Sequence, residues 1–375
     1  MRPWLRAALL ALAVALAGCA SAPPALPPVA PAAAVDTGPQ AVIGALALDA
    51  HLEARILALD PQQVSDSDVR QVLALGPTPR IVALHGGIYP VHLVMESFTR
   101  FLAGMGYPAA KLRHPGDGRL SHSPYESSLQ LAGLIGWYYE REATMPMMVG
   151  HSQGGIQLIK VLHDLAGDGV TQIAVWNPHT DTAEPRVTIV DPFSGAERPV
   201  VGLKIGYASV VGSGGAALML PNQWSMARRL RTIPDTVDDF TGYALGVDLV
   251  AWDLPGAGTR YRAQGSARVR NVELPAEYSH VFVPQTSHLA RDAAMRDWLN
   301  AYQPGQAALT APVVQTRAAD NSLWAADVWY HIKKHWVLEA QKVVRARRDL
   351  ARRQTALDPG SVATSAPVQA EEARQ

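Results

Sequence analysis

Cysteine is almost absent from this chain. Cys19 is the only cysteine among 375 residues, so there is no second thiol with which it could form an internal disulfide. Cysteine and histidine do not cluster, and no His-Glu-x-x-His sequence occurs, so nothing in the sequence predicts a zinc site. A Gly-x-Gly-x-x-Gly fingerprint after a strand and a Walker sequence are also missing. We therefore expect neither a metal nor a cofactor.

An excess of charge of either sign is missing as well. Lysine and arginine together number 33, and so do aspartate and glutamate. A nucleic-acid-binding protein needs a basic excess, so this balance argues against a nucleic-acid partner. Hydrophobic residues make up 48% of the chain and aromatic residues 7%, which is ordinary for a globular protein. Without its two ends, described below, the chain keeps about 300 residues, enough for one large domain.

Long apolar runs are also lacking, and one short run lies at the N-terminus. Arg2 and Arg6 precede the run Leu9–Ala17, which is too short for a stable membrane span and is typical of an export signal. The Leu-Ala-Gly-Cys sequence that ends at Cys19 resembles the lipobox of bacterial lipoproteins. The resemblance implies a signal peptide over residues 1–19 and a membrane anchor on lipidated Cys19. No aspartate follows the cysteine, which favours the outer membrane of a bacterial cell envelope, on its periplasmic side.

Two further segments have the composition of unfolded chain. Residues 20–40 are rich in alanine and proline, which predicts an extended tether. Residues 354–375 are polar and predict a disordered tail. Between them we expect one folded domain over residues 41–305 and a helical extension over residues 306–353.

The most informative motif lies in the middle of the chain. The apolar run Met147–Val149 leads into the sequence Gly-His-Ser-Gln-Gly centred on Ser152, and a helical pattern over residues 156–165 follows. A strand, a sharp turn with Gly-x-Ser-x-Gly and a helix form a nucleophile elbow. The glycines admit neighbouring backbone where a Cβ atom would clash, and the strained turn lifts the serine hydroxyl clear of the sheet. The backbone amide of Gln153 is then expected to face the space above Ser152, where an oxyanion can form.

Strand and helix patterns alternate around this motif. Helices are predicted at residues 43–57, 66–75, 91–105 and 125–142, and strands at residues 80–84, 109–113 and 172–176. Such alternation requires right-handed crossovers, so it predicts an α/β fold with a mostly parallel, doubly wound sheet.

The order of these motifs resembles the α/β-hydrolase superfamily, to which serine esterases and lipases belong, over about residues 78–300. A His-Gly-Gly sequence ends the early strand, with its first residue, His85, 67 positions before Ser152. The resemblance implies that the backbone amide of Gly87 joins that of Gln153 in an oxyanion hole. It also implies that an acid and then a histidine follow Ser152, the acid after the penultimate strand and the histidine after the last.

Two histidines qualify as the base that activates the serine. Residues 279–284 are predicted as the last strand, and a closing helix is predicted from Leu289. His288 lies in the loop between them and is therefore assigned as the base. His280 falls within the predicted strand and remains the alternative.

Three aspartates qualify as the acid that orients the histidine. Residues 247–252 are predicted as the penultimate strand, and Asp253 follows them directly. Asp253 is therefore assigned as the acid. Asp248, within that strand, and Asp239, further upstream, remain the alternatives.

Two segments exceed what a minimal hydrolase needs. Residues 177–232 contain a predicted hairpin over residues 186–190 and 199–205, and this segment is interpreted as a cap or lid over Ser152. Residues 321–353 have a helical pattern with an apolar face and a basic end. That helix is expected to pack on the domain or to rest its basic end on anionic lipid.

The resemblance implies a serine hydrolase that cleaves carboxylic esters, an esterase or lipase, through an acyl-enzyme on Ser152. Its expected partners are an ester or lipid substrate and the membrane reached through Cys19. Two other hypotheses stay open: a catalytically silent envelope scaffold or binding lipoprotein, and a membrane-associated acyltransferase.

Overall fold

The computed structural model describes residues 39–219, 221–246, 248, 260–305 and 321–357. The predictions made for the signal peptide, for Cys19, for most of the tether, for Asp253 and for the end of the chain lie outside these residues. Within the described ranges, no helix is both long enough and apolar enough to cross a membrane.

A five-stranded sheet forms the centre of the molecule, and every pair of neighbours in it is parallel. Its strands, in spatial order, are β1 (Ile81–Leu84), β2 (Met147–His151), β7 (Ile205–Val211), β9 (Val237–Leu245) and β11 (Arg268–Leu274). The fold is therefore α/β with a parallel central sheet, as the alternation of patterns predicts.

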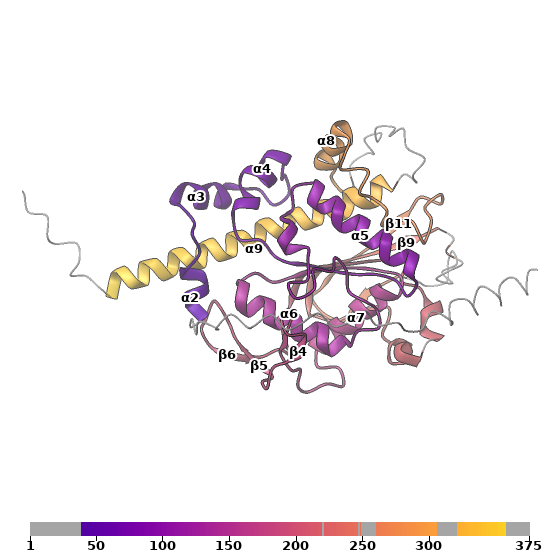
Figure 1. The fold of residues 1–375 in the computed structure, drawn as a ribbon, viewed down its shortest axis with the longest axis horizontal. Helices are drawn as coiled ribbons and strands as arrows, with labels where there is room; N and C mark the ends of the chain where they lie inside the picture. The colour runs from indigo at the N-terminus through magenta and orange to yellow at the C-terminus, as the bar shows by residue number, and fades with distance from the viewer. Residues whose placement is uncertain (1–38, 220, 247, 249–259, 306–320, 358–375) are drawn as a thin grey trace, which may run out of the picture. The chain divides into compact units, whose positions relative to one another are not determined.

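Helices cover both faces of this sheet (Figure 1). The first face carries α5 (Tyr89–Gly104), α8 (Ala293–Ala301) and the long α9 (Ser322–Leu357). The second face carries α6 (Ser128–Glu142) and α7 (Gln153–Leu165). The strands serve both layers because side chains alternate along them: in β2, Met147 and Val149 join the first core and Met148 the second. All five β2 residues are buried, as expected for a strand inside a parallel sheet.

Short elements connect and flank these layers. They are α2 (Pro39–Gly44), α3 (Ala50–Ala58), α4 (Asp66–Gln71), β3 (Trp176–Asn177), β4 (Thr182–Ala183), β5 (Thr188–Val190), β6 (Glu197–Pro199), β8 (Thr232–Ile233), β10 (Arg262–Ala263) and the 3₁₀ turns η1 (Leu73–Leu75), η2 (Ala109–Lys111), η3 (Gly215–Met219) and η4 (Pro221–Met226).

The helix predictions agree with the structure better than the strand predictions do. Residues 109–111 form the 3₁₀ turn η2 and residues 112–113 a bend, rather than a strand. Residues 172–176 only reach the first residue of the two-residue strand β3. Residues 279–284 contain turns and no strand. The last strand of the sheet is instead β11, which ends at Leu274.

The cap predicted over residues 177–232 is wrong in part, because the segment contains β7. This strand lies in the middle of the sheet and pairs with β2 on one side and β9 on the other. The predicted hairpin does exist as β5 and β6, but its Phe193 stacks on Tyr139 near the C-terminal end of α6. Since α6 ends just before β2 begins, the hairpin lies near the amino-terminal ends of the strands, whereas Ser152 follows the carboxyl end of β2. It is therefore not a lid over that residue.

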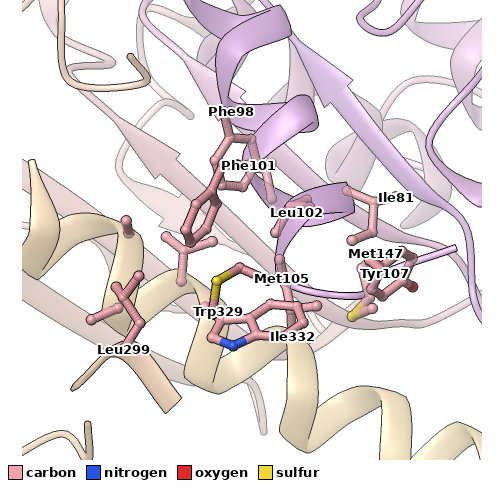
Figure 2. Close-up of a cluster of buried hydrophobic side chains, with 14 of the residues drawn as sticks. Ile81, Phe98, Phe101, Leu102, Met105, Tyr107, Met147, Leu299, Trp329 and Ile332 are labelled. Atoms are coloured by element: carbon pink, nitrogen blue, oxygen red, sulfur yellow. The ribbon is translucent and has the colours of Figure 1, made fainter. Parts of the chain in front are cut away.

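Helix α9 packs its apolar face on the sheet. Its Trp329 and Ile332 are fully buried and lie close to Met105, which caps the C-terminal end of α5, in the core shown in Figure 2. Near the basic end, Arg347 and Arg348 form ion pairs with the buried Glu53 of α3. Of the two expectations for this helix, packing on the domain is the one that the structure confirms.

We expect Trp329→Ala to lower the free energy of unfolding by about 3–5 kcal/mol. The indole is fully buried, and its Nε1 donates to the Asn300 side-chain oxygen at 2.8 Å, so both packing and a hydrogen bond disappear. Trp224→Ala is the matched control, because that indole is 63% exposed and should cost only about 0.5 kcal/mol. Urea denaturation followed by circular dichroism measures both, and equal destabilisation would contradict this account of the core.

Candidate active site

Ser152 lies in the tight turn between β2 and α7. Its backbone has φ 54° and ψ −126°, a conformation that costs a non-glycine residue about 1–3 kcal/mol and is typical of functional sites. The backbone amide of Ser152 donates to the carbonyl of Val211 on the neighbouring strand β7 at 2.9 Å. The strained turn predicted from Gly-x-Ser-x-Gly is therefore present and tied to the centre of the sheet.

The glycines around Ser152 are required by close backbone approaches. A Cβ atom on Gly150 would come within 2.6 Å of the Cα of Gly155, and one on Gly154 within 2.6 Å of the Leu84 carbonyl oxygen. A Cβ atom on Gly155 would collide with the Ser213 hydroxyl and approach the Val210 Cβ to 3.0 Å. The spacing of the motif thus follows from the packing of α7 against β1 and β7.

We expect Gly154→Ala to displace the end of β1 from the turn at Ser152, because the added methyl group would collide with the carbonyl oxygens of Leu84 and His85. Overpacking should also cost about 1–3 kcal/mol of stability. Gly215→Ala is the control, since a Cβ atom there meets nothing within 4 Å. Thermal denaturation of both variants provides the test, and a Gly154→Ala protein as stable as the unaltered one would refute the packing argument.

The histidine that reaches Ser152 is His280. Its Nε2 lies 2.9 Å from the Ser152 Oγ, and its Nδ1 lies 2.6 Å from an Asp248 carboxylate oxygen. Asp248 is 2% exposed and His280 is 8% exposed, so the hydrogen bond between them is shielded from water. The arrangement is a serine, a histidine and an aspartate in hydrogen-bonded sequence.

The assignment of the base to His288 is therefore corrected to His280. His288 is half-buried, and the preceding Ser287 is hydrogen bonded to Ser97 of α5. The physical reason for the error is the position of the last strand. Because β11 ends at Leu274, the loop that follows the last strand begins before His280.

The assignment of the acid changes for the same reason. Asp253 lies outside the described residues, whereas Asp248 follows β9, the penultimate strand, by three residues and holds the His280 ring. Asp239 lies inside β9 and pairs with Arg268, Lys334 and His335. These partners hold the pKa of Asp239 well below its usual range despite its burial, so it serves the packing of α9 on the sheet.

The topology of the sheet brings the three side chains together. Ser152 follows β2, Asp248 follows β9 and His280 follows β11. Since these strands are parallel, their carboxyl ends meet at one edge of the sheet, where α/β proteins commonly bind ligands. Ser152 and His280, which are 128 positions apart in the sequence, can contact one another only because of this arrangement.

A further residue of the site, Gly212, was not identified from the sequence. It follows β7, has φ +62°, and a Cβ atom on it would lie 3.0 Å from two atoms of the His280 ring. Because Gly212 has no side chain, the imidazole has room between Ser152 and Asp248, and glycine adopts the positive φ without strain. In the sequence, Gly212 begins a Gly-Ser-Gly-Gly run, whose composition alone predicts only a flexible turn.

The two predicted oxyanion-hole residues lie beside each other. A Cβ atom on Gly87 would collide with the Gln153 side-chain oxygen, and one on the preceding Gly86 would lie 3.1 Å from the Ser152 Cβ. The Tyr125 hydroxyl donates to the Gly87 carbonyl at 3.2 Å and so restrains this loop. Gln153 is also the first residue of α7, whose N-terminal dipole favours negative charge.

The groups that meet at this site are those of nucleophilic catalysis by a serine. A serine hydroxyl is paired with an imidazole, the imidazole is paired with a carboxylate, and candidate amide donors lie nearby. In the described part of the chain, no group of three or more His, Cys, Asp or Glu side chains could hold a metal ion.

Comparison of the sequence with protein-family models and with curated proteins finds no match.

Proposed function

We propose that this chain is a serine hydrolase of the α/β-hydrolase type that cleaves carboxylic esters through an acyl-enzyme on Ser152. The observation that carries the proposal is the hydrogen-bonded series from the Ser152 Oγ through His280 to Asp248. Ser152 itself has a positive φ and lies in the turn between a strand and a helix, as the serine of a nucleophile elbow does.

In the proposed mechanism, His280 Nε2 takes the proton of Ser152 as its Oγ attacks the ester carbonyl carbon. The resulting oxyanion accepts hydrogen bonds from the amides of Gly87 and Gln153, each contributing about 100-fold or more in rate. The tetrahedral intermediate collapses, His280 returns the proton to the departing alkoxide, and the alcohol leaves. Water then loses a proton to His280 as it attacks the acyl-enzyme. The second tetrahedral intermediate collapses, His280 returns the proton to the Ser152 Oγ, and the acid is released.

Asp248 has two tasks in this scheme. By accepting a hydrogen bond from the Nδ1–H of His280, it keeps Nε2 unprotonated and aimed at the serine. Its negative charge also stabilises the imidazolium that forms during each step, and the burial of both groups strengthens this interaction.

Exposed apolar side chains beside the site favour an ester with an apolar part. Ile88 follows Gly87 and is 47% exposed, Tyr125 touches the same loop and is 62% exposed, and Phe282 lies two residues after His280 and is 47% exposed. Lipid esters suit such surroundings. We further propose that Cys19 anchors the chain in a bacterial envelope membrane, a part of the proposal that rests on the lipobox-like sequence.

The direct test is hydrolysis of p-nitrophenyl esters from acetate to palmitate by the purified full-length chain. Turnover that disappears in Ser152→Ala, together with labelling of Ser152 by a fluorophosphonate, would support the mechanism, and the preferred chain length would separate an esterase from a lipase. Absence of both turnover and labelling would reject it in favour of a silent scaffold. Transfer of the acyl group to an added lipid alcohol would indicate an acyltransferase.

A further inference from the structure

His151 is a buried histidine that the proposed mechanism does not use. It ends β2, precedes Ser152 and is fully buried. Its Nε2 lies 2.7 Å from the backbone carbonyl oxygen of His280, and the two rings are 5.2 Å apart. A carbonyl oxygen only accepts hydrogen bonds, so Nε2 must carry the proton and donate it.

The protonation state of His151 follows from its surroundings. Burial, and then the neighbouring His280, lower the pKa of His151 to about 3. The ring is therefore neutral near neutral pH and has a single N–H group, which the His280 carbonyl uses. Its Nδ1 has no hydrogen-bond partner within the described part of the chain, which agrees with an unprotonated nitrogen in an apolar setting.

The backbone at His280 needs such a restraint. Residues 275–292, between β11 and α8, contain turns but neither helix nor strand. Asp248 holds the ring of His280 through Nδ1, but a carboxylate at the ring does not determine where the main chain lies. The His151 donor supplies that second point of attachment from the rigid end of β2.

His151, Ser152 and His280 are linked in a closed ring of contacts. The Ser152 Oγ contacts the His280 ring, the His280 carbonyl accepts from the His151 ring, and a peptide bond joins His151 to Ser152. We infer that His151 is a positioning residue, which sets the distance between the His280 Nε2 and the Ser152 Oγ by holding the His280 backbone. This inference rests on the proposed function, since positioning matters only if His280 acts as a base.

The first test compares two variants of similar size. His151→Met removes the donor, and we expect kcat to fall about 100-fold with KM changed less than about twofold, because a misplaced base slows the chemical step without weakening substrate binding. His151→Gln can place an amide N–H near the carbonyl and should recover most of the activity. Thermal midpoints of both variants serve as the folding control. Full activity in His151→Met, or equal losses in two folded variants, would overturn the inference.

The second test needs no variant and no activity. In the full chain carrying ¹⁵N-labelled histidine, two-bond ¹H–¹⁵N spectra near neutral pH should show His151 neutral with its proton on Nε2. A proton on Nδ1, or a charged ring, would overturn the inference even if both variants failed to fold. If the unaltered protein hydrolyses no ester, the proposed function fails, while the tautomer still decides whether His151 holds the His280 carbonyl.

Discussion

His280→Ala is expected to lower kcat/KM for ester hydrolysis about 10⁴-fold or more, whereas His288→Ala should leave it within about threefold of the unaltered protein. The difference follows from geometry, because the imidazole that lies 2.9 Å from the Ser152 Oγ belongs to His280. A serine hydroxyl without a neighbouring base is a poor nucleophile, so its removal affects the chemical step itself. Steady-state kinetics on p-nitrophenyl butyrate measure both variants.

A chemical rescue separates the loss of the base from a loss of folding. Replacing His280 leaves a space beside Ser152, and added imidazole should restore part of the activity of His280→Ala but none of that of Ser152→Ala. Thermal midpoints of all three proteins should be compared in the same buffer. If His288→Ala were the inactive variant and His280→Ala kept its activity, the proposed site would be wrong.

The nucleophile elbow could be predicted from the sequence because its causes are local. Gly150 faces the backbone of Gly154 and Gly155, which the strand–turn–helix connection itself brings close, and the serine conformation follows from the turn. Gly154 depends in addition on the neighbouring strand, because it faces the carbonyl oxygen of Leu84 at the end of β1. The early strand with its His-Gly-Gly end is local in the same way. These parts of the fold and of the site agree with the structure.

The base and the acid could not be found in this way, because their positions depend on which segments pair as strands. β11 reads Arg-Val-Arg-Asn-Val-Glu-Leu and lies at the edge of the sheet, with only its last residue buried. A search for apolar runs in the sequence misses such a strand, because these residues form a strand through their pairing with β9 and not through their hydrophobicity. The next apolar segment, residues 279–284, has the pattern of a last strand, and this pattern moves the predicted base from His280 to His288.

The same cause explains the misplaced cap. β7 is apolar and fully buried, but nothing within its seven residues shows that they insert between β2 and β9. Both of its neighbours are far away in the sequence. The interpretation of residues 177–232 as one insertion therefore combined a peripheral hairpin with a central strand.

Asp248→Asn is expected to lower kcat about 10⁴-fold with little change in KM, by analogy with the loss seen when a serine-hydrolase aspartate becomes an amide. The carboxylate lies 2.6 Å from the His280 Nδ1 and is nearly inaccessible to water. An asparagine of the same shape can turn its NH₂ group toward Nδ1, which moves the imidazole proton to Nε2, where it blocks attack by Ser152. The amide also lacks the charge that stabilises the imidazolium.

Asp253→Asn tests whether the acid is Asp248, which contacts His280 in the structure, or Asp253, which the strand pattern of the sequence predicts. If Asp248 orients His280, the Asp253 variant should retain activity within about threefold, since the Nδ1 position is already occupied. The two aspartates lie on the same short segment, so a general disturbance of that segment would lower the activity of both variants. Only a loss confined to Asp248→Asn, with an unchanged thermal midpoint, supports the assignment. A loss confined to Asp253→Asn would instead mean that another arrangement of the segment after β9 is the active one, with His280 still available as the base.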